Sequence, residues 1–151
     1  MPYFPVSLEN QNGKTALVIA IEKDNIDMAR VLLSHAADAN ASRKNWPLST
    51  AVMHNNIPMV ELLVEYGANV NDVINDQSLL TLAIRYRNNQ KRNMDLIKCL
   101  AKHGLDPLPD LEIGPLENAL NYMDEELVKY LIQRYHIMPS AKRYQLAVGK
   151  Q

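Results

Sequence analysis

The chain has 151 residues, 47% of them hydrophobic, which suits a single domain with a sizeable buried core. Its formal net charge of −1 gives no overall attraction to nucleic acid or to an anionic membrane. Cys99 is the only cysteine, which excludes an internal disulfide and is typical of a reducing compartment. No apolar run approaches the roughly 20 residues of a membrane-spanning helix, and Met1–Ser7 lacks the pattern of a secretion signal. We therefore expect a soluble, cytoplasmic protein.

A helix pair recurs four times along the chain. Each copy has an anchor alanine with a leucine three residues before it, and successive copies lie 31, 32 and 36 residues apart. The alanines are Ala20, Ala51, Ala83 and Ala119, and the leucines are Leu17, Leu48, Leu80 and Leu116. A near-constant period of this length predicts stacked helix pairs rather than one closed globule.

The copies also share the residues that begin and end helices. First helices are predicted to open at Thr15, Trp46, Ser78 and Gly114, and second helices at Asn25, Asn56, Asn93 and Asp124. Thr, Ser, Asn and Asp side chains can accept a hydrogen bond from a free amide of the first helical turn. Gly67 and Gly104 stand where a helix turns into left-handed backbone, and Ala36 and Tyr135 occupy that column in the other copies.

The second helix of each copy carries apolar residues at i, i+3 and i+4. This spacing predicts one buried stripe along each helix. The four sets are Met28, Val31 and Leu32; Met59, Leu62 and Leu63; Leu96, Cys99 and Leu100; and Leu127, Tyr130 and Leu131.

These segments resemble the ankyrin repeat. The second copy matches best, with Trp46–Val52 (WPLSTAV) followed by Asn56–Asn71 (NIPMVELLVEYGANVN). The resemblance covers about residues 9–138 and implies an all-α solenoid of stacked antiparallel helix pairs with short hairpin loops and a concave face. It divides the chain into a cap segment (1–10), repeats at 11–41, 42–72, 73–108 and 109–138, and a C-terminal capping helix at 139–151.

The chain departs from the family pattern at the motif histidines, and its two ends carry separate predictions. The histidine of the usual Thr-Pro-Leu-His motif is replaced by Val18, Ser49, Thr81 and Glu117, so its hydrogen-bond network is missing or replaced and we expect lower stability than in a consensus array. At the ends, Tyr3, Phe4 and Val6 are expected to fold back over apolar surface. The C-terminal helix is interpreted either as a lid on the fourth repeat or as a docking helix for a partner.

The resemblance also implies a partner-binding surface, since family members usually bind through hairpin tips and the exposed side of the first helices. The matching positions are Asn12, Lys14, Glu22, Lys23, Arg43, Asn45, Trp46, Met53, His54, Asn75, Gln77, Arg85, Tyr86, Asn121 and Tyr122. Trp46 replaces a small polar residue. It either anchors a partner, as Trp often does, or packs across a loop that is about two residues shorter than the family norm.

The third copy carries an insertion at residues 85–92, which contains Arg85, Tyr86, Arg87, Lys91 and Arg92 around an Asn-Asn-Gln centre. Its four positive charges suit an acidic protein segment or a phosphate group, and loops on a rigid scaffold often carry function. The alternative is a solvated loop that is tolerated because insertions there cost little.

No catalytic or cofactor motif is present. His35 and His103 fall near the ends of second helices, where a donor or cation meets free carbonyl groups, so a structural role is expected. Cys99 and His103 have a metal-compatible spacing, but Cys99 occupies a core column and no second pair follows. The sequence also lacks a phosphate loop, a Gly-x-Ser-x-Gly elbow and a His-Glu-x-x-His helix. We expect no metal, no cofactor and no enzymatic activity.

The sequence therefore predicts a monomeric protein–protein interaction module, an adaptor or inhibitor that binds another protein, with an acidic or extended segment as a suitable target. Nucleic acid and membranes are not expected partners. The alternative is a recognition domain of a larger or secreted bacterial or viral effector that acts on host proteins in the host cytoplasm, with any catalysis elsewhere.

Overall fold

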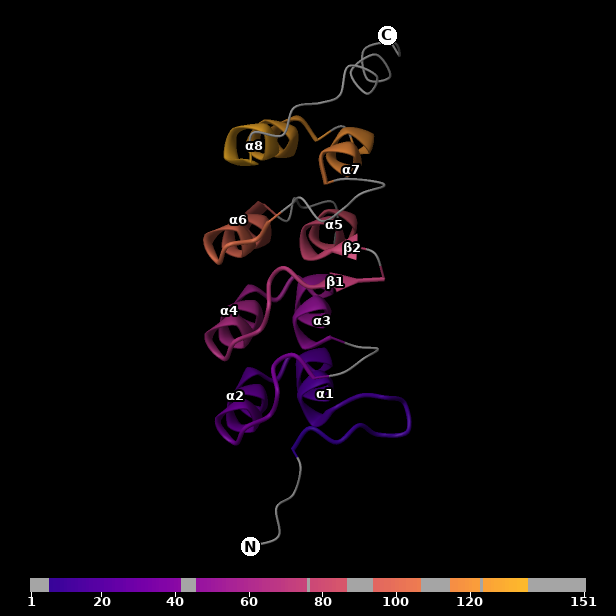
Figure 1. The fold of residues 1–151 in the computed structure, drawn as a ribbon, viewed down its shortest axis with the longest axis vertical. Helices are drawn as coiled ribbons and strands as arrows, with labels where there is room; N and C mark the ends of the chain where they lie inside the picture. The colour runs from indigo at the N-terminus through magenta and orange to yellow at the C-terminus, as the bar shows by residue number, and fades with distance from the viewer. Residues whose placement is uncertain are drawn as a thin grey trace, which may run out of the picture.

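A computed structural model describes residues 6–41, 46–75, 77–86, 94–106, 115–122 and 124–135, with side chains for all of these except residues 115–117. Helices in these ranges pair and stack in chain order into an elongated solenoid (Figure 1). The inner column contains α1 (Ala16–Glu22), α3 (Pro47–Met53), α5 (Leu79–Arg85) and α7 (Pro115–Asn121). The outer column contains α2 (Ile26–Ser34), α4 (Ile57–Glu65), α6 (Met94–Lys102) and α8 (Glu125–Tyr135). The predicted solenoid of antiparallel helix pairs is confirmed.

Helix starts follow the predicted caps. The side chains of Thr15, Asn25, Asn56, Ser78 and Asp124 each accept a hydrogen bond from the amide three residues later, at 2.9–3.3 Å. Trp46 makes no such bond, and α3 begins instead with Pro47, whose missing N–H costs nothing at the first helical position. Asn93 and Gly114 lie outside the described residues.

A short hairpin links the second helix pair to the third. In it, β1 (Val73–Ile74) pairs antiparallel with β2 (Gln77–Ser78), so that Val73 lies opposite Ser78 and Ile74 opposite Gln77. Among the described residues, β1 and β2 are the only two strands. The insertion predicted at residues 85–92 begins later than expected, because Arg85 is the last residue of α5; residues 87–92 lie outside the described ranges.

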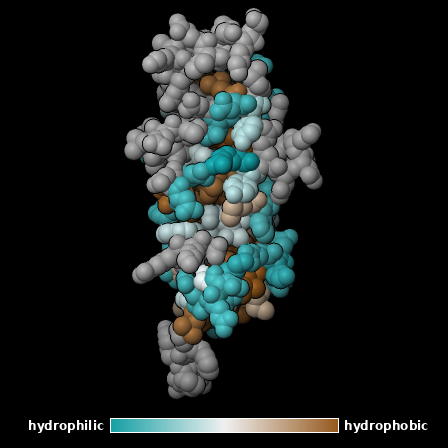
Figure 2. Space-filling view, turned by 90° about the vertical axis from the view of Figure 1, so that its right-hand side faces the viewer, coloured by the Kyte–Doolittle hydropathy of each residue, from teal (hydrophilic) through white to brown (hydrophobic). Residues whose placement is uncertain are grey.

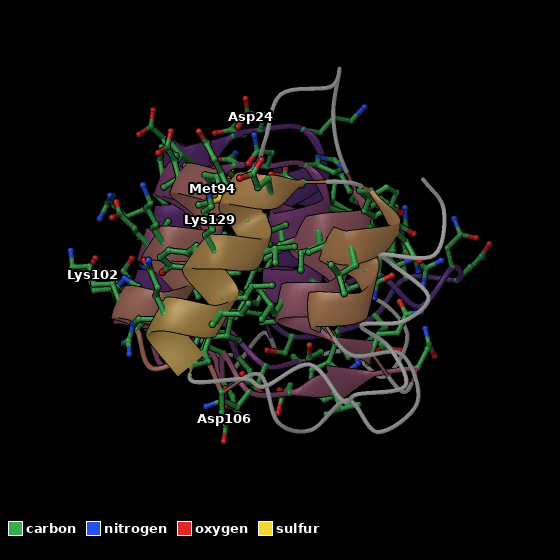
Figure 3. All side chains as sticks on the ribbon, turned by 90° about the horizontal axis from the view of Figure 1, so that it is seen from above. Asp24, Met94, Lys102, Asp106 and Lys129 are labelled. Carbon is green, nitrogen blue, oxygen red and sulfur yellow. The ribbon has the colours of Figure 1, made fainter. Side chains whose placement is uncertain are left out.

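The core lies between the two helix columns (Figure 3). The four anchor alanines and the anchor leucines Leu17, Leu48 and Leu80 are all buried. On α4 and α6 the predicted stripes are buried as well, and on α8 Leu127 and Leu131 are buried while Tyr130 is half-buried. Leu116 has no described side chain.

The predicted stripe of α2 is wrong in two of its three positions. Met28 is 50% exposed and Val31 is 53% exposed, whereas Leu32 is partly buried. The reason is the stacking order: α4 packs on α2 and α6 packs on α4, but none of the described residues covers the opposite side of α2. An apolar side chain is removed from water only where a neighbouring helix or loop packs against it.

Two asparagines connect consecutive repeats. The Asn40 side chain donates to the Gly67 carbonyl at 2.9 Å and accepts from the Asn69 amide at 2.9 Å. One repeat later, Asn71 donates to the Gly104 carbonyl at 3.1 Å and accepts from the Asp106 amide at 2.7 Å. We call Asn40 and Asn71 the asparagine clamps. They bridge adjacent repeats in a chain whose motif histidines are replaced.

The N-terminal segment is tied to the first repeat. Val6 packs against the core, and Ser7 Oγ accepts a hydrogen bond from the Asp38 amide at 3.2 Å. Glu9 forms a bridge with Thr15, while Leu8 is exposed. Tyr3, Phe4 and the predicted C-terminal helix at 139–151 lie outside the described residues.

Candidate protein-interaction surface

The predicted surface residues lie in two rows at opposite ends of the inner helices. The hairpin row, where inner helices begin, contains Asn12, Lys14, Trp46, Asn75 and Gln77. The turn row, where inner helices end, contains Glu22, Lys23, Met53, His54, Arg85, Tyr86, Asn121 and Tyr122. Figure 3, viewed along the stack, shows the two edges through Asp24 on the turn side and Asp106 on the hairpin side. The remaining predictions, Arg43, Asn45, Arg87, Lys91 and Arg92, lie outside the described residues.

Two tyrosines stand out in the turn row. Tyr86 follows α5 and Tyr122 follows α7, and they are 47% and 42% exposed. Because α5 and α7 pack side by side, the two tyrosines occupy the same column in adjacent repeats, about one helix spacing of 8–10 Å apart. The matching positions of the first two repeats are Lys23 and His54, both exposed. The turn row is therefore aromatic at one end of the stack and polar at the other.

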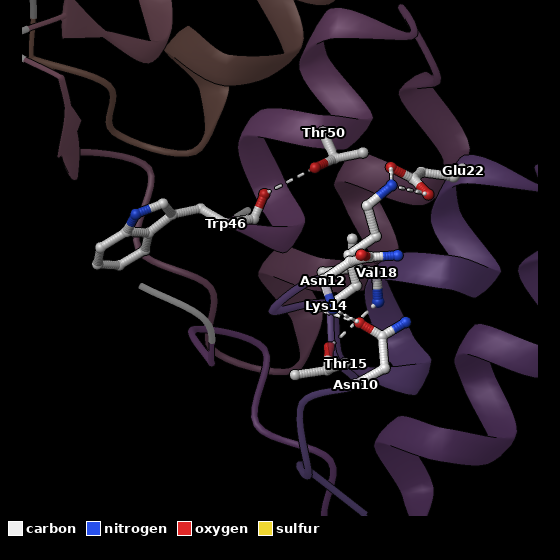
Figure 4. A network of polar contacts seen from close by, with 8 residues as sticks. All are labelled: Asn10, Asn12, Lys14, Thr15, Val18, Glu22, Trp46 and Thr50. Carbon is white, nitrogen blue, oxygen red and sulfur yellow. Dashed lines mark hydrogen bonds and ion pairs between the residues drawn. The ribbon is translucent and has the colours of Figure 1, made fainter. Parts of the chain in front are cut away.

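On the first repeat, an ion pair between Lys14 of the hairpin row and Glu22 of the turn row connects the two rows. The Lys14 ammonium contacts both carboxylate oxygens of Glu22, at 2.6 and 2.8 Å, and both side chains are about one-third exposed (Figure 4). An ion pair of this exposure contributes up to about 1 kcal/mol. Asn12 lies in the same hairpin, which closes through the Asn10 side chain as acceptor for the Asn12 and Lys14 amides. The charges of Lys14 and Glu22 are therefore already paired with each other.

Trp46 is half-buried. Its ring points away from the Lys14–Glu22 pair (Figure 4) and lines a shallow hollow with Asn69, Asp72 and Ile74 of the following loops. Its carbonyl accepts hydrogen bonds from Ser49 Oγ at 2.9 Å and Thr50 Oγ1 at 3.1 Å. The hollow is too small for an organic ligand. Trp46 thus contributes to local packing whether or not it also contacts a partner.

Figure 2 faces the side of the stack formed by the inner helices and the hairpins. The described residues on this side are mainly hydrophilic, with small separate hydrophobic areas. Asn75 is exposed at the hairpin tip with φ +50°, which asparagine tolerates better than most residues, and Gln77 is half-buried beside it. In the turn row, Met53 is half-buried and His54, Arg85 and Asn121 are exposed. This side therefore suits polar recognition.

The two histidines near outer-helix ends differ. His35 Nδ1 lies 2.8 Å from the Val31 carbonyl, which confirms its predicted structural role. His103 lies after α6, and its buried Nε2 has no hydrogen-bond partner among the described residues. Cys99 on α6 and Glu61 on α4 lie beside it. Burial, with the nearby Glu61 charge, raises the pKa of the Cys99 thiol, and Lys102 opposes this.

Sequence reasoning found Cys99 and His103 as a spaced pair but missed Glu61. The third residue belongs to the preceding repeat, so no short motif contains all three. The signal that would have found it is the repeat itself: once α4 and α6 are aligned as stacked outer helices, Glu61 faces the junction that Cys99 borders. None of the described helices is long and apolar enough to cross a membrane.

Comparisons with known proteins agree with this architecture. A family profile described as ankyrin repeats (3 copies) matches residues 4–74, and a second, described as ankyrin repeats (many copies), matches residues 48–101. A crystal structure of an ankyrin repeat domain from Acinetobacter baumannii superimposes with a TM-score of 0.77 at 25% sequence identity, covering 85% of this chain and 68% of that one.

Three curated relatives show the same likeness. An ankyrin repeat protein of Fowlpox virus is 32% identical over 68 residues (44% of this chain, 16% of the relative). A second from the same virus is 30% identical over 103 residues (68% and 24%), and alpha-latrotoxin-Lg1a of Latrodectus geometricus is 35% identical over 132 residues (81% and 9%). The chain thus spans less than a quarter of the length of each. With the stacked helix pairs and the two profile matches, which together span residues 4–101, this chain belongs to the ankyrin-repeat family.

Proposed function

We propose that this chain is a non-enzymatic adaptor or inhibitor that binds an acidic, extended segment of another protein along the turn row and the adjoining inner helices. Ankyrin repeats are in general protein-interaction modules. The observation that carries the finer proposal is the placement of Tyr86 and Tyr122, exposed in one column of adjacent repeats with Arg85 beside them.

The chemistry of these side chains favours such a target. Tyrosine and arginine are the residue types that most often anchor interfaces, because they combine a large apolar contact with a polar tip. Arg85 and Lys23 are exposed cations of the turn row. Two carboxylates on the same side already have partners, since Glu22 is paired with Lys14 and Asp24 accepts a hydrogen bond from the Asn56 side chain. The row therefore presents positive charge and aromatic surface, which complement carboxylates and apolar side chains of an extended segment.

A peptide-display selection against the purified chain tests this proposal. We expect enriched peptides to be rich in Asp and Glu, and the double substitution Tyr86→Ala/Tyr122→Ala to weaken their binding by about tenfold or more. Arg85→Ala should weaken binding further and reduce its salt dependence. Calorimetry measures the affinities, and circular dichroism checks that the helices remain.

Tyr66→Ala is the matched control. Tyr66 is also an exposed tyrosine, but it follows α4 in the outer column, away from the turn row. Its removal should leave peptide affinity unchanged. Peptides that bind the double variant as tightly as the wild type would place the interface elsewhere on the stack.

A second candidate is the recognition domain of a larger effector. The observation that favours it is length, since the chain spans only 9–24% of the viral and toxin relatives described above. In that case the turn row would select the target and another domain would act on it. Sequencing the transcript that encodes this chain tests the idea: an open reading frame that continues beyond these 151 residues supports it, and one that stops at both ends opposes it.

A further inference from the structure

Three metal-ligating side chains from two neighbouring repeats meet at the outer column. Glu61 lies on α4, Cys99 on α6 and His103 just after it, and one ligand atom from each lies within 4.8 Å of the other two. Residues four apart on a helix share a face, and α4 packs beside α6. In the part of the chain that the structure describes, this is the one group of three or more His, Cys, Asp or Glu side chains whose ligand atoms come this close together.

The repeat provides an internal comparison. At the junction of the first and second repeats, the positions that match Glu61, Cys99 and His103 are Arg30, Leu62 and Tyr66. At the junction of the third and fourth repeats, they are Lys98, Tyr130 and Arg134. Neither set offers a thiolate, an imidazole or a carboxylate. The ligand trio is thus a property of one junction and is not required by the stacking pattern.

His103 supplies independent evidence. Its Nε2 atom is buried and has no hydrogen-bond partner among the described residues, although an unsatisfied buried polar atom costs free energy. His35, in the same column of the first repeat, instead places its Nδ1 2.8 Å from a backbone carbonyl. A cation bound at Nε2 would satisfy the His103 ring.

We propose that Glu61, Cys99 and His103 bind a Zn²⁺ ion that links the second and third repeats. Zn²⁺ accepts sulfur, imidazole nitrogen and carboxylate oxygen in one tetrahedral site, and water completes a site with three protein ligands. Hard cations such as Mg²⁺ and Ca²⁺ disfavour a thiolate. On binding, the Cys99 thiol loses its proton to solvent, and the metal–sulfur bond takes its place.

To bind Zn²⁺, the three ligand atoms need to move only slightly closer together. Zn²⁺ bonds of about 2.0–2.3 Å place tetrahedral ligand atoms roughly 3.5 Å apart, against separations of up to 4.8 Å here. Glu61 is exposed, so its carboxylate can rotate toward Cys99 without displacing core side chains. The same exposure of Glu61 gives the ion a path from solvent, and His103 is half-buried beside it. Because the ligands come from two repeats, bound Zn²⁺ stabilises their contact by mass action.

Titration of the reduced, full-length chain with Zn²⁺ and Co²⁺ tests the site. We expect one equivalent of either ion to bind and to raise the thermal midpoint, and Co²⁺ to give the charge-transfer absorption of a cobalt–thiolate bond. Cys99→Ser should remove that absorption. Glu61→Gln and His103→Gln should each weaken Zn²⁺ binding by about tenfold or more, since even residues that only orient a ligand cost this much.

Matched variants separate a built site from surface binding. His35→Gln removes the equivalent histidine of the first repeat, and Glu65→Gln removes an exposed carboxylate one turn further along α4. Both should leave Zn²⁺ affinity and the cobalt spectrum unchanged. The absence of a cobalt–thiolate band in the wild type, or equal Zn²⁺ affinity in wild type and Glu61→Gln, would overturn the proposal; Glu61 is exposed, so the latter variant should remain folded.

Discussion

The outer helices of the first two repeats, α2 and α4, have similar sequences, but their matching apolar side chains differ in burial. Met28 and Val31 of α2 match Met59 and Leu62 of α4 in register and in polarity. Yet Met59 and Leu62 are buried, while Met28 and Val31 are about half exposed. The difference is that α4 has α2 beneath it and α2 has no described residue in that position. An apolar stripe defines which face of a helix favours burial, but a neighbour decides whether that burial occurs.

The inner column shows the same contrast. Ile19 of α1 is partly exposed, whereas Thr50 and Leu82, its matches on α3 and α5, are buried. In a stacked array, stability is approximately the sum of what each repeat contributes and what each junction contributes. Among the described residues, the first repeat therefore has one junction where the second and third have two, and within this described part of the stack we expect it to be the less stable repeat.

The largest expected effect comes from truncating the two methionines. Met59→Ala should lower the free energy of unfolding by about 2–5 kcal/mol, because it removes a buried side chain and leaves a cavity. Met28→Ala should lower it by less than about 1 kcal/mol, since half of that side chain is already in water. Urea denaturation followed by circular dichroism measures both. Equal losses would show that some other part of the protein covers Met28.

The asparagine clamps give the next effect. Asn40→Ala removes two hydrogen bonds between the first and second repeats, and we expect a loss of about 1–3 kcal/mol at roughly 0.5–1.5 kcal/mol for each bond. Amide hydrogen exchange should then become faster in α1 and α2 than in α3 and α4, because the first repeat is uncoupled.

Two further variants test whether each asparagine clamp stabilises a single junction. Asn71→Ala should instead loosen the junction between the second and third repeats, and Asn12→Ala, at an exposed hairpin position, should change little. If Asn40→Ala and Asn71→Ala accelerate exchange in the same helices, the clamps do not act on single junctions.

Local features of the fold were predictable from sequence, because their signals are local. Thr15, Asn25 and Asn56 cap helices that begin where expected, and Gly67 and Gly104 adopt the left-handed backbone that ends α4 and α6. These residues act within one helical turn, so the pattern of their neighbours determines their role.

Features that depend on stacking were not predictable. The exposure of Met28 requires knowledge of what lies below α2, and the bonds of Asn40 require the path of the loop one repeat later. Glu61 is separated from Cys99 by 38 positions, so its proximity appears only when α4 and α6 are placed side by side. For the candidate surface, sequence named residues such as Lys14 and Tyr86, but only the structure separates a paired charge from an exposed aromatic ring.

The smallest expected effect concerns the backbone at the ends of outer helices. Ala36 has φ +66° in the column where Gly67 and Gly104 have φ +87° and +86°. Left-handed backbone places the Cβ atom of an L-residue close to its own carbonyl group, a strain that glycine lacks. Ala36→Gly should therefore raise the free energy of unfolding by about 0.5–1 kcal/mol.

The reciprocal substitution, Gly67→Ala, isolates this cause. A Cβ atom at Gly67 meets no atom within 4 Å, so the variant adds backbone strain without a steric clash. It should lower the free energy of unfolding by about 1 kcal/mol. Urea denaturation of both variants checks the opposite signs. A loss of stability in Ala36→Gly would mean that the greater freedom of glycine in the unfolded chain outweighs the strain relieved at the end of α2. A gain would show that the first repeat carries backbone strain at Ala36 that Gly67 and Gly104 avoid in the next two repeats.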